Sequence, residues 1–166
     1  MKMELIQPFI NAADAVLAQT LQSPATVADV NMEENAYRRK GVAAEVGING
    51  DIEGRVIFDL DPATAMKVAE HLAGGAVDGS EEMTAETVCE LANMVIGNAV
   101  SSLNDQGFQF KITPPELHSV DSGYTGSVDS EALVLEFRTL SGSLFMNIVM
   151  RYNRRRRADH VSSGAD

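Results

Sequence analysis

The sequence has few cysteines and few aromatic rings: it contains one cysteine, Cys89, no tryptophan and 5% aromatic residues. A single cysteine excludes an internal disulfide and is typical of a reducing compartment, so we expect a cytoplasmic protein. No apolar run reaches the roughly 18 residues of a membrane-spanning helix. The segment after Lys2 has no continuous apolar stretch with a cleavage-like end, which predicts no secretion signal.

Residue sets with the spacing of a metal or nucleotide site are also missing. The three histidines, His71, His118 and His160, lie far apart, and no His, Cys or carboxylate set has metal-ligand spacing, so we expect no metal bound by this chain. Cys89 has no evident histidine partner, which favours a buried inert thiol over a nucleophile. No P-loop or dinucleotide-binding fingerprint is present.

Positive charge is scarce and unevenly placed. The chain has 13 basic and 24 acidic residues, a net charge of −11. Five of the basic residues are Arg151 and Arg154–Arg157, and 8 basic and 22 acidic residues precede them, so that part carries −14. Such a body repels nucleic acid and anionic membranes, and we expect neither as a partner. For the arginine run itself, contact with nucleic acid or membrane, a tether to an acidic partner, and a solubilising disordered end all remain open.

The hydrophobic patterns predict one α+β domain over residues 1–152 and a basic, disordered tail over residues 153–166. The expected helices are Met3–Gln22 with Pro8 in or near its first turn, Asp61–Ala73 and Thr84–Asn104, the last capped by Ser80 or Thr84. The expected strands are Thr26–Met32, Gly41–Ile48, Arg55–Leu60, Phe108–Ile112, Ala132–Thr139 and Leu144–Tyr152, with a hairpin turn at Asn49-Gly50. Short connections favour a mostly antiparallel sheet with long helices on one face, and the two halves share a rough α-β-β-β order.

The helix expected at Thr84–Asn104 has two very different faces. One stripe is a predicted core face: Val88, Leu91, Ala92, Val95, Ala99, Ser102 and Leu103. The opposite stripe consists of Glu90, Asn93, Gly97, Ser101 and Asn104. A solvated helix face is normally rich in Lys, Arg, Glu and Gln, and glycine inside a helix costs about 1 kcal/mol relative to alanine. The bare stripe therefore indicates a surface that a partner approaches closely.

This helix resembles the active helix of the CheC/CheX/FliY family of response-regulator phosphatases. The resemblance rests on Glu90-Leu91-Ala92-Asn93, on Gly97 and on Pro114-Pro115 further along, and the block ELANMVIGNA is most similar to the CheX branch. The order of elements from Met3 to about Arg151 also follows a CheX-like domain. One departure is Glu86, which stands where the family has Asp or Ser.

The resemblance implies hydrolysis of the aspartyl phosphate of a CheY-type receiver domain. It assigns Asn93 to positioning the attacking water and Glu90 to docking on the receiver's lysine. Residues expected to contact the partner are Glu86, Met94, Gly97, Val100 and Ser101. No cofactor is expected on this chain, because the receiver supplies Mg²⁺. The CheX branch also implies a homodimer joined through sheet edges, with which apolar strand ends such as Leu144–Met150 are compatible.

Two other functions use the same surface differently. A non-catalytic module would recognise a receiver, phosphorylated or not, as a scaffold in chemotaxis or two-component signalling. An interaction domain would have no receiver partner at all. Accelerated decay of a phosphorylated receiver separates the enzyme from both alternatives.

Overall fold

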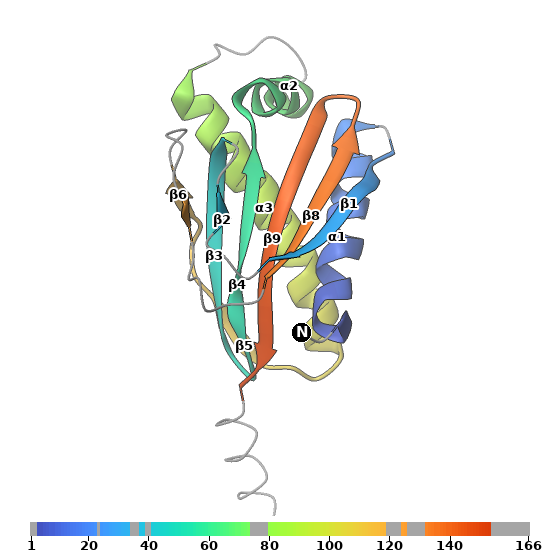
Figure 1. The fold of residues 1–166 in the computed structure, drawn as a ribbon, viewed down its shortest axis with the longest axis vertical. Helices are drawn as coiled ribbons and strands as arrows, with labels where there is room; N and C mark the ends of the chain where they lie inside the picture. Colours follow the sequence, from blue (N-terminus) through green and yellow to red (C-terminus); the bar gives the residue numbers. More distant parts are fainter. Residues whose placement is uncertain are drawn as a thin grey trace, which may run out of the picture.

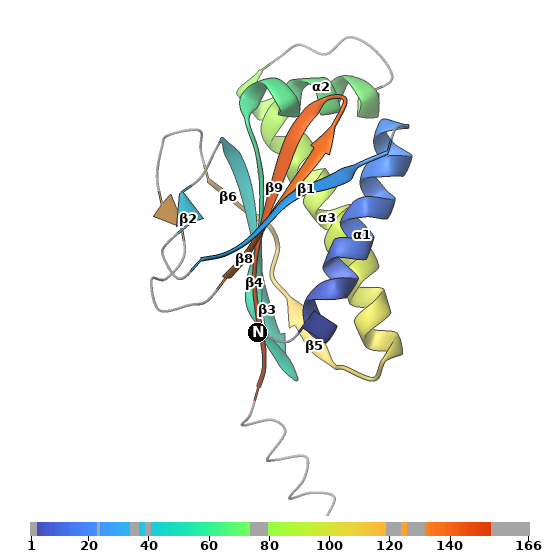
Figure 2. The ribbon, with the colours of Figure 1, turned by 45° about the vertical axis from the view of Figure 1, so that its right-hand side comes forward.

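The computed structural model describes residues 3–22, 24–33, 37–38, 41–73, 80–118, 124–125 and 132–153. Its helices are α1 (Met3–Leu21), α2 (Pro62–Ala73) and α3 (Glu81–Asp105). Its strands are β1 (Thr26–Glu33), β2 (Tyr37–Arg38), β3 (Val42–Gly50), β4 (Ile52–Leu60), β5 (Phe110–Ile112), β6 (Glu116–His118), β7 (Tyr124–Thr125), β8 (Ala132–Thr139) and β9 (Gly142–Tyr152). Figures 1 and 2 show α1 and α3 on one face of the main sheet and α2 across one end. The predicted α+β architecture is confirmed.

The main sheet interleaves two similar halves of the chain. Its seven antiparallel strands follow the order β1-β8-β9-β4-β3-β5, and β6 also pairs with β3; β2 and β7 form a separate pair. The last strands of the two halves, β4 and β9, meet in the centre. Each half sends its leading strand or strands to the other half, because β1 pairs with β8, and β5 and β6 pair with β3. The α-β-β-β repetition is therefore present, with its strands exchanged between halves.

The core fills the space between this sheet and the two long helices. Its largest fully buried side chains include Phe9 and Leu17 of α1, Phe58 of β4 and Leu91 of α3. Burying one such side chain contributes about 1.5–3 kcal/mol. Because so many of these contacts come from α3, its rotation about its own axis is fixed, and with it the face that points outward.

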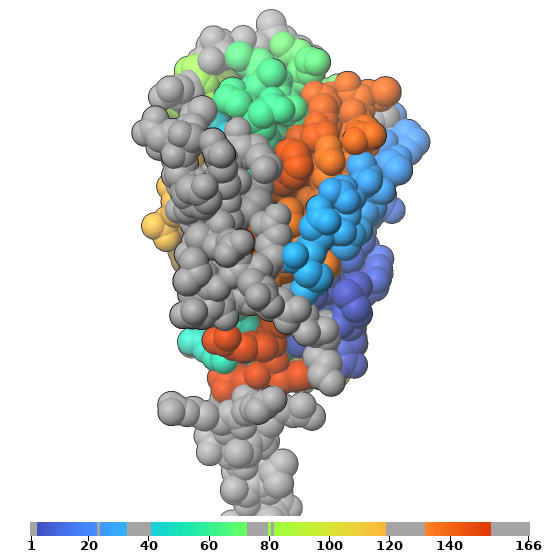
Figure 3. Space-filling view, viewed as in Figure 1, coloured from blue at the N-terminus to red at the C-terminus, as the bar shows by residue number. Residues whose placement is uncertain are grey.

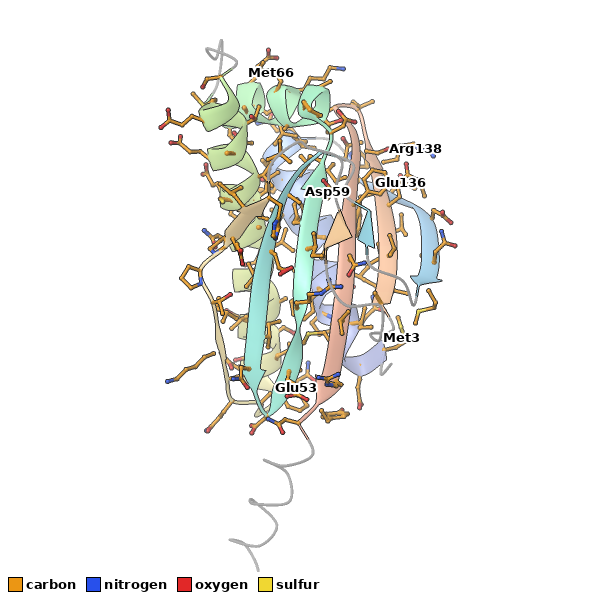
Figure 4. All side chains as sticks on the ribbon, turned by 60° about the vertical axis from the view of Figure 1, so that its left-hand side comes forward. Met3, Glu53, Asp59, Met66, Glu136 and Arg138 are labelled. Atoms are coloured by element: carbon orange, nitrogen blue, oxygen red, sulfur yellow. The ribbon has the colours of Figure 1, made fainter. Side chains whose placement is uncertain are left out.

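The other face of the sheet carries a small apolar cluster and a polar pair. Figure 3 views the molecule from this side, where β1 and part of β9 are visible. Ala43, Ile57 and Val134 form the cluster. Arg55 donates from a guanidinium nitrogen to the Oδ1 of Asn147 at 2.6 Å. Burial lowers the pKa of Arg55, and the Glu45 carboxylate nearby acts in the opposite direction. Figure 4 shows Asp59, Glu136 and Arg138 towards the α2 end of the molecule and Glu53 at the opposite end.

Helix boundaries differ from the predictions at two places. α3 begins at Glu81, before Thr84, because the Ser80 hydroxyl, one of the two predicted caps, accepts a hydrogen bond from the Met83 amide at 3.1 Å. Pro8, expected in or near the first turn of α1, lies inside the helix in its second turn. The helix forgoes the amide bond to the Glu4 carbonyl there, and the buried proline ring compensates by packing.

The β3–β4 hairpin turns around Asp51, and the predicted turn at Asn49-Gly50 is wrong. The β3–β4 pairing ends at Ile48 and Gly54, while Asn49 and Gly50 pair with β5. Gly50 has φ 156°, and a Cβ there would lie 2.4 Å from the Cα of Phe110. Glycine at this position therefore allows β5 to approach. In the sequence, this glycine after Asn49 looks the same as one required by a turn.

Strand β9 lies between β8 and β4, so Leu144–Met150 is interior and provides no exposed sheet edge. The edges among the described strands of the main sheet are β1 on one side and β5 and β6 on the other. Of the predicted tail, residues 154–166 lie outside the described residues, so the boundary at 152 stays a prediction. None of the described helices combines the length and apolar character needed to cross a membrane.

Candidate functional site

The candidate site is the outward face of α3, and its orientation follows from the seat of that helix. Leu91, Ala92, Val95 and Ala99 are fully buried against the sheet and α1. Ser102, predicted on the same core stripe, is instead exposed beside α1. The stripe is thus buried at its apolar positions, Leu103 included, and exposed at Ser102, where a groove opens between the two helices.

Glu90, Asn93, Gly97 and Ser101 are all exposed on α3, as predicted. Glu90 and Asn93 are three residues apart, which places their side chains about 5–6 Å from each other on the helix surface. A carboxylate and a carboxamide at this separation can contact one partner group together. The stripe is otherwise free of long side chains, so a partner has access to both.

The polar atoms of this stripe are engaged unequally. The Ser101 hydroxyl donates to the Gly97 carbonyl at 3.1 Å, so its donor is already used. Within the described part of the chain, no hydrogen bond or ion pair holds the Glu90 or Asn93 side chain. A Cβ added at Gly97 would have no heavy atom within 4 Å. Glycine is therefore not required there by any intramolecular contact in that part.

The remaining predicted contact residues surround the stripe to different degrees. Glu86 is exposed one turn before Glu90, and Met94 is exposed beside Asn93. Val100 is only half-buried at the surface and packs against the hydrophobic core, so only part of its side chain faces outward. The structure therefore brings Glu86, Glu90, Asn93 and Met94 to one accessible face, and leaves Val100 at its margin.

Two apolar residues that the sequence did not single out lie on the edge strands beside β3. Ile112 of β5 pairs with Ile48, and Leu117 of β6 pairs with Ala44, two residues that point into the helix-covered core. Ile112 and Leu117 therefore point to the same side, but both are exposed because the helices do not reach them. They extend the accessible surface from α3 onto the sheet edge.

A polar groove between α1 and α3 was also missed by sequence reasoning. Its volume is about 600 Å³, and Glu4, Asn11, Asn98, Ser101 and Asp105 are among the residues that line it. Only the register of two distant helices brings these side chains together. The sequence signal that could have indicated the groove was the polar character of the exposed faces of α1 and α3.

Among the described residues, one group has ligand atoms close enough for a metal ion: Glu45, Glu116 and His118, whose atoms lie within 4.8 Å of one another. Register explains their meeting, because Glu116 pairs with Glu45 across β3 and β6. Glu116 is exposed, and such carboxylates commonly gather without an ion, so this group is not assigned a function. Burial raises the pKa of Cys89, which keeps the thiol protonated and is consistent with its predicted inertness.

The chain matches a known protein family over a region that includes α3. Residues 42–138 match the family model described as "Chemotaxis phosphatase CheX". The chain is similar to the CheY-P phosphatase CheX of Thermotoga maritima, with 29% identity over 114 residues that make up 68% of each chain.

Solved structures agree with this match. CheX in the CheX–CheY–BeF3–Mg²⁺ complex from Borrelia burgdorferi is 32% identical, with a TM-score of 0.64 and coverage of 90% of this chain and 99% of that one. A CheC-like superfamily protein from Shewanella sp. PV-4 has a TM-score of 0.81 at 20% identity, covering 91% and 99%. The second similarity shows the shared fold alone.

Proposed function

Because the chain belongs to the CheX family of chemotaxis phosphatases, we propose that it hydrolyses the aspartyl phosphate of a CheY-type receiver domain in the cytoplasm. The observation that carries the proposal is the outward placement of Glu90 and Asn93, close together and unengaged by described residues. The names of two relatives support it, since one is a CheY-P phosphatase and the other was solved with CheY, BeF3 and Mg²⁺. In this mechanism the receiver supplies the magnesium ion.

The chain contributes a positioned water to the reaction. The water oxygen attacks phosphorus while the bond from phosphorus to the aspartate oxygen breaks, which releases inorganic phosphate and restores the receiver's carboxylate. Phosphoryl transfer depends mainly on positioning and charge stabilisation. The receiver's magnesium and lysine provide the charge. The Asn93 carboxamide both accepts from and donates to one water molecule, so it holds the water in line without removing its proton.

Glu90 fixes the register of the two proteins through an ion pair with the receiver's lysine. Replacing Glu90 by Gln keeps the shape and removes the charge, so we expect kcat/KM to fall about 10–100-fold, the range for one hydrogen bond to a charged group. The loss should appear mainly in KM and shrink at high salt. Steady-state dephosphorylation at two ionic strengths measures it. Glu82→Gln, in the first turn of α3, is the matched control, and an equal loss there would contradict the docking role.

Receiver decay tests the function directly. Candidate receivers are phosphorylated with a small-molecule phosphodonor, and the decay of the aspartyl phosphate is followed with and without this protein. Accelerated decay of at least one receiver is the expected result. Binding without acceleration would instead identify a receiver-binding module, and neither effect on any receiver would reject the proposal.

We also propose a homodimer, joined through the β1 edge of the main sheet. Val27, Val30 and Met32 of β1 are exposed, and among the described strands β1 pairs only with β8, so its outer side has no strand partner there. The Val30 amide donates to the Asp29 Oδ1 at 3.0 Å. An exposed apolar edge strand is a ready template for pairing with a second copy. The dimer contact is therefore assigned to β1 and not to Leu144–Met150 of β9, which lies in the sheet interior.

Charges on this edge should dissociate the dimer. Val30 is 52% and Met32 49% exposed, so the double variant Val30→Glu and Met32→Glu should leave the fold intact while it places like charges on the two facing edges. We expect the mass measured by light scattering to fall from two copies to one. Leu140→Glu is the control, because Leu140 is 88% exposed away from the edge. A mass of one copy in the unmodified protein would contradict the dimer.

A further inference from the structure

The groove between α1 and α3 has no role in the mechanism proposed above. It is lined by the carboxylates of Glu4 and Asp105 and by the carboxamides of Asn11 and Asn98, and no lysine or arginine is among its described lining residues. The Asn11 Oδ1 already accepts a hydrogen bond from the Gln7 Nε2 at 2.9 Å, so the two carboxylates are the main acceptors for a ligand. Carboxylate and amide oxygens accept hydrogen bonds, and a guanidinium offers five donors in a fixed planar arrangement. The chemistry of the groove therefore matches arginine side chains.

Four arginines follow in the sequence from a strand end that lies beside this groove. Strand β9 ends at Tyr152, whose hydroxyl donates to the Glu4 carboxylate in the groove lining, and Arg154–Arg157 follow directly after Asn153. Figures 1 and 2 show the end of β9 and the first turn of α1 at the same end of the molecule. Four residues span up to about 14 Å of chain. The stretch of α3 from Asn98 to Asp105 is about 10 Å long, so the arginines can reach its length.

We propose that Arg154–Arg157 bind in the groove between α1 and α3 of their own chain. The part of the chain before Arg151 carries −14, and a covalently attached cationic segment meets its surface at an effective concentration in the millimolar range. The other roles considered for these arginines, a solubilising end and a tether to an acidic partner, both require the arginines to leave that internal site. Ser101 belongs to the groove and to the stripe around Asn93. A seated tail therefore hinders receiver docking, a consequence that rests on the proposed function.

Paramagnetic broadening in the full chain tests the docking without any receiver. A nitroxide is attached at Ser162→Cys in a Cys89→Ser background, and amide signals are compared before and after reduction of the label. We expect at least twofold broadening of the amides of residues 98–106, and none in α2 at the far end of the molecule. Raising the salt to 1 M should remove it, because exposed charge pairs are screened.

Charge variants decide whether the groove is the site. Glu4→Gln with Asp105→Asn should abolish the broadening, while Asp14→Asn with Glu70→Gln, exposed carboxylates outside the groove lining, should preserve it. Glu4→Gln retains an acceptor for the Tyr152 hydroxyl, so the local fold is kept. Broadening that survives neutralisation of the groove, or that arises only between different copies in a mixture of labelled and isotope-enriched chains, would overturn the proposal.

Phosphatase assays measure the consequence separately. Replacing Arg154–Arg157 by Gln should raise kcat/KM about 2–10-fold at low salt through KM alone, since the tail competes with the receiver for one surface. If no variant shows phosphatase activity, the proposed function fails while the broadening still decides the docking. If activity is present and the broadening absent, the docking fails and the proposed function stands.

Discussion

The Asn93→Ala variant should lose phosphatase activity almost completely while still binding the receiver. Asn93 is exposed and no contact with a described residue holds its side chain, so truncation removes no intramolecular interaction found in that part. What it removes is the group that holds the attacking water in line. Loss of one preorganised hydrogen-bonding group at a reacting centre lowers kcat about 10²–10³-fold. Single-turnover decay of a phosphorylated receiver at saturating protein measures this effect, and binding of a BeF3-treated receiver measures docking.

Two controls separate this loss from misfolding. Thermal unfolding of Asn93→Ala should occur at or slightly above the temperature for the parent, because alanine is the better helix former at an exposed position. Asn49→Ala removes an exposed carboxamide on β3, away from α3, and should retain activity. Wild-type turnover in Asn93→Ala would exclude the water-positioning role. Loss of turnover together with loss of receiver binding would assign Asn93 to docking instead.

The fold was predictable where local pattern and tertiary packing demand the same residues. The 3.6-residue period places Leu91, Val95 and Ala99 in the core, and strand β8 was predicted with its observed limits, Ala132–Thr139. Prediction failed where a distant segment decides the outcome. Gly50 serves the approach of β5, not a two-residue turn. Strand β9 has the sequence pattern of any apolar strand, and only its pairing with β4 of the other half puts it in the sheet interior.

The same division holds for the site. The exposure of Glu90 and Asn93 on one face could be predicted because their motif is local to a single helix, and helix geometry alone brings them together. Ile112, Leu117 and the groove beside Asp105 could not, since each depends on which strand or helix lies alongside. Ser102 illustrates the limit: it follows the core period of α3, yet α1 leaves it exposed.

Gly97→Ala should make the protein more stable and a poorer phosphatase. A Cβ at Gly97 meets no heavy atom within 4 Å, and an interior helical glycine costs about 1 kcal/mol relative to alanine, so the free energy of unfolding should rise by about that amount. If the receiver's backbone approaches α3 here, the added methyl group overpacks the complex. Overpacking costs about 1–3 kcal/mol, which corresponds to a fall in kcat/KM of roughly 5–150-fold. Gly97→Leu should extend the activity loss further.

Opposite signs make this substitution informative, because general damage to the protein lowers stability and activity together. Denaturant unfolding and kcat/KM for the same samples provide the two readouts. Gly107→Ala is the matched glycine control: its φ of 96° strains any other residue, so it should lower stability and leave kcat/KM unchanged. Full activity in both Gly97 variants would mean that no receiver atom comes close to this point of α3. The smooth stripe would then be only a tolerated feature of the helix, and docking would have to rest on Glu90 and the β5–β6 edge.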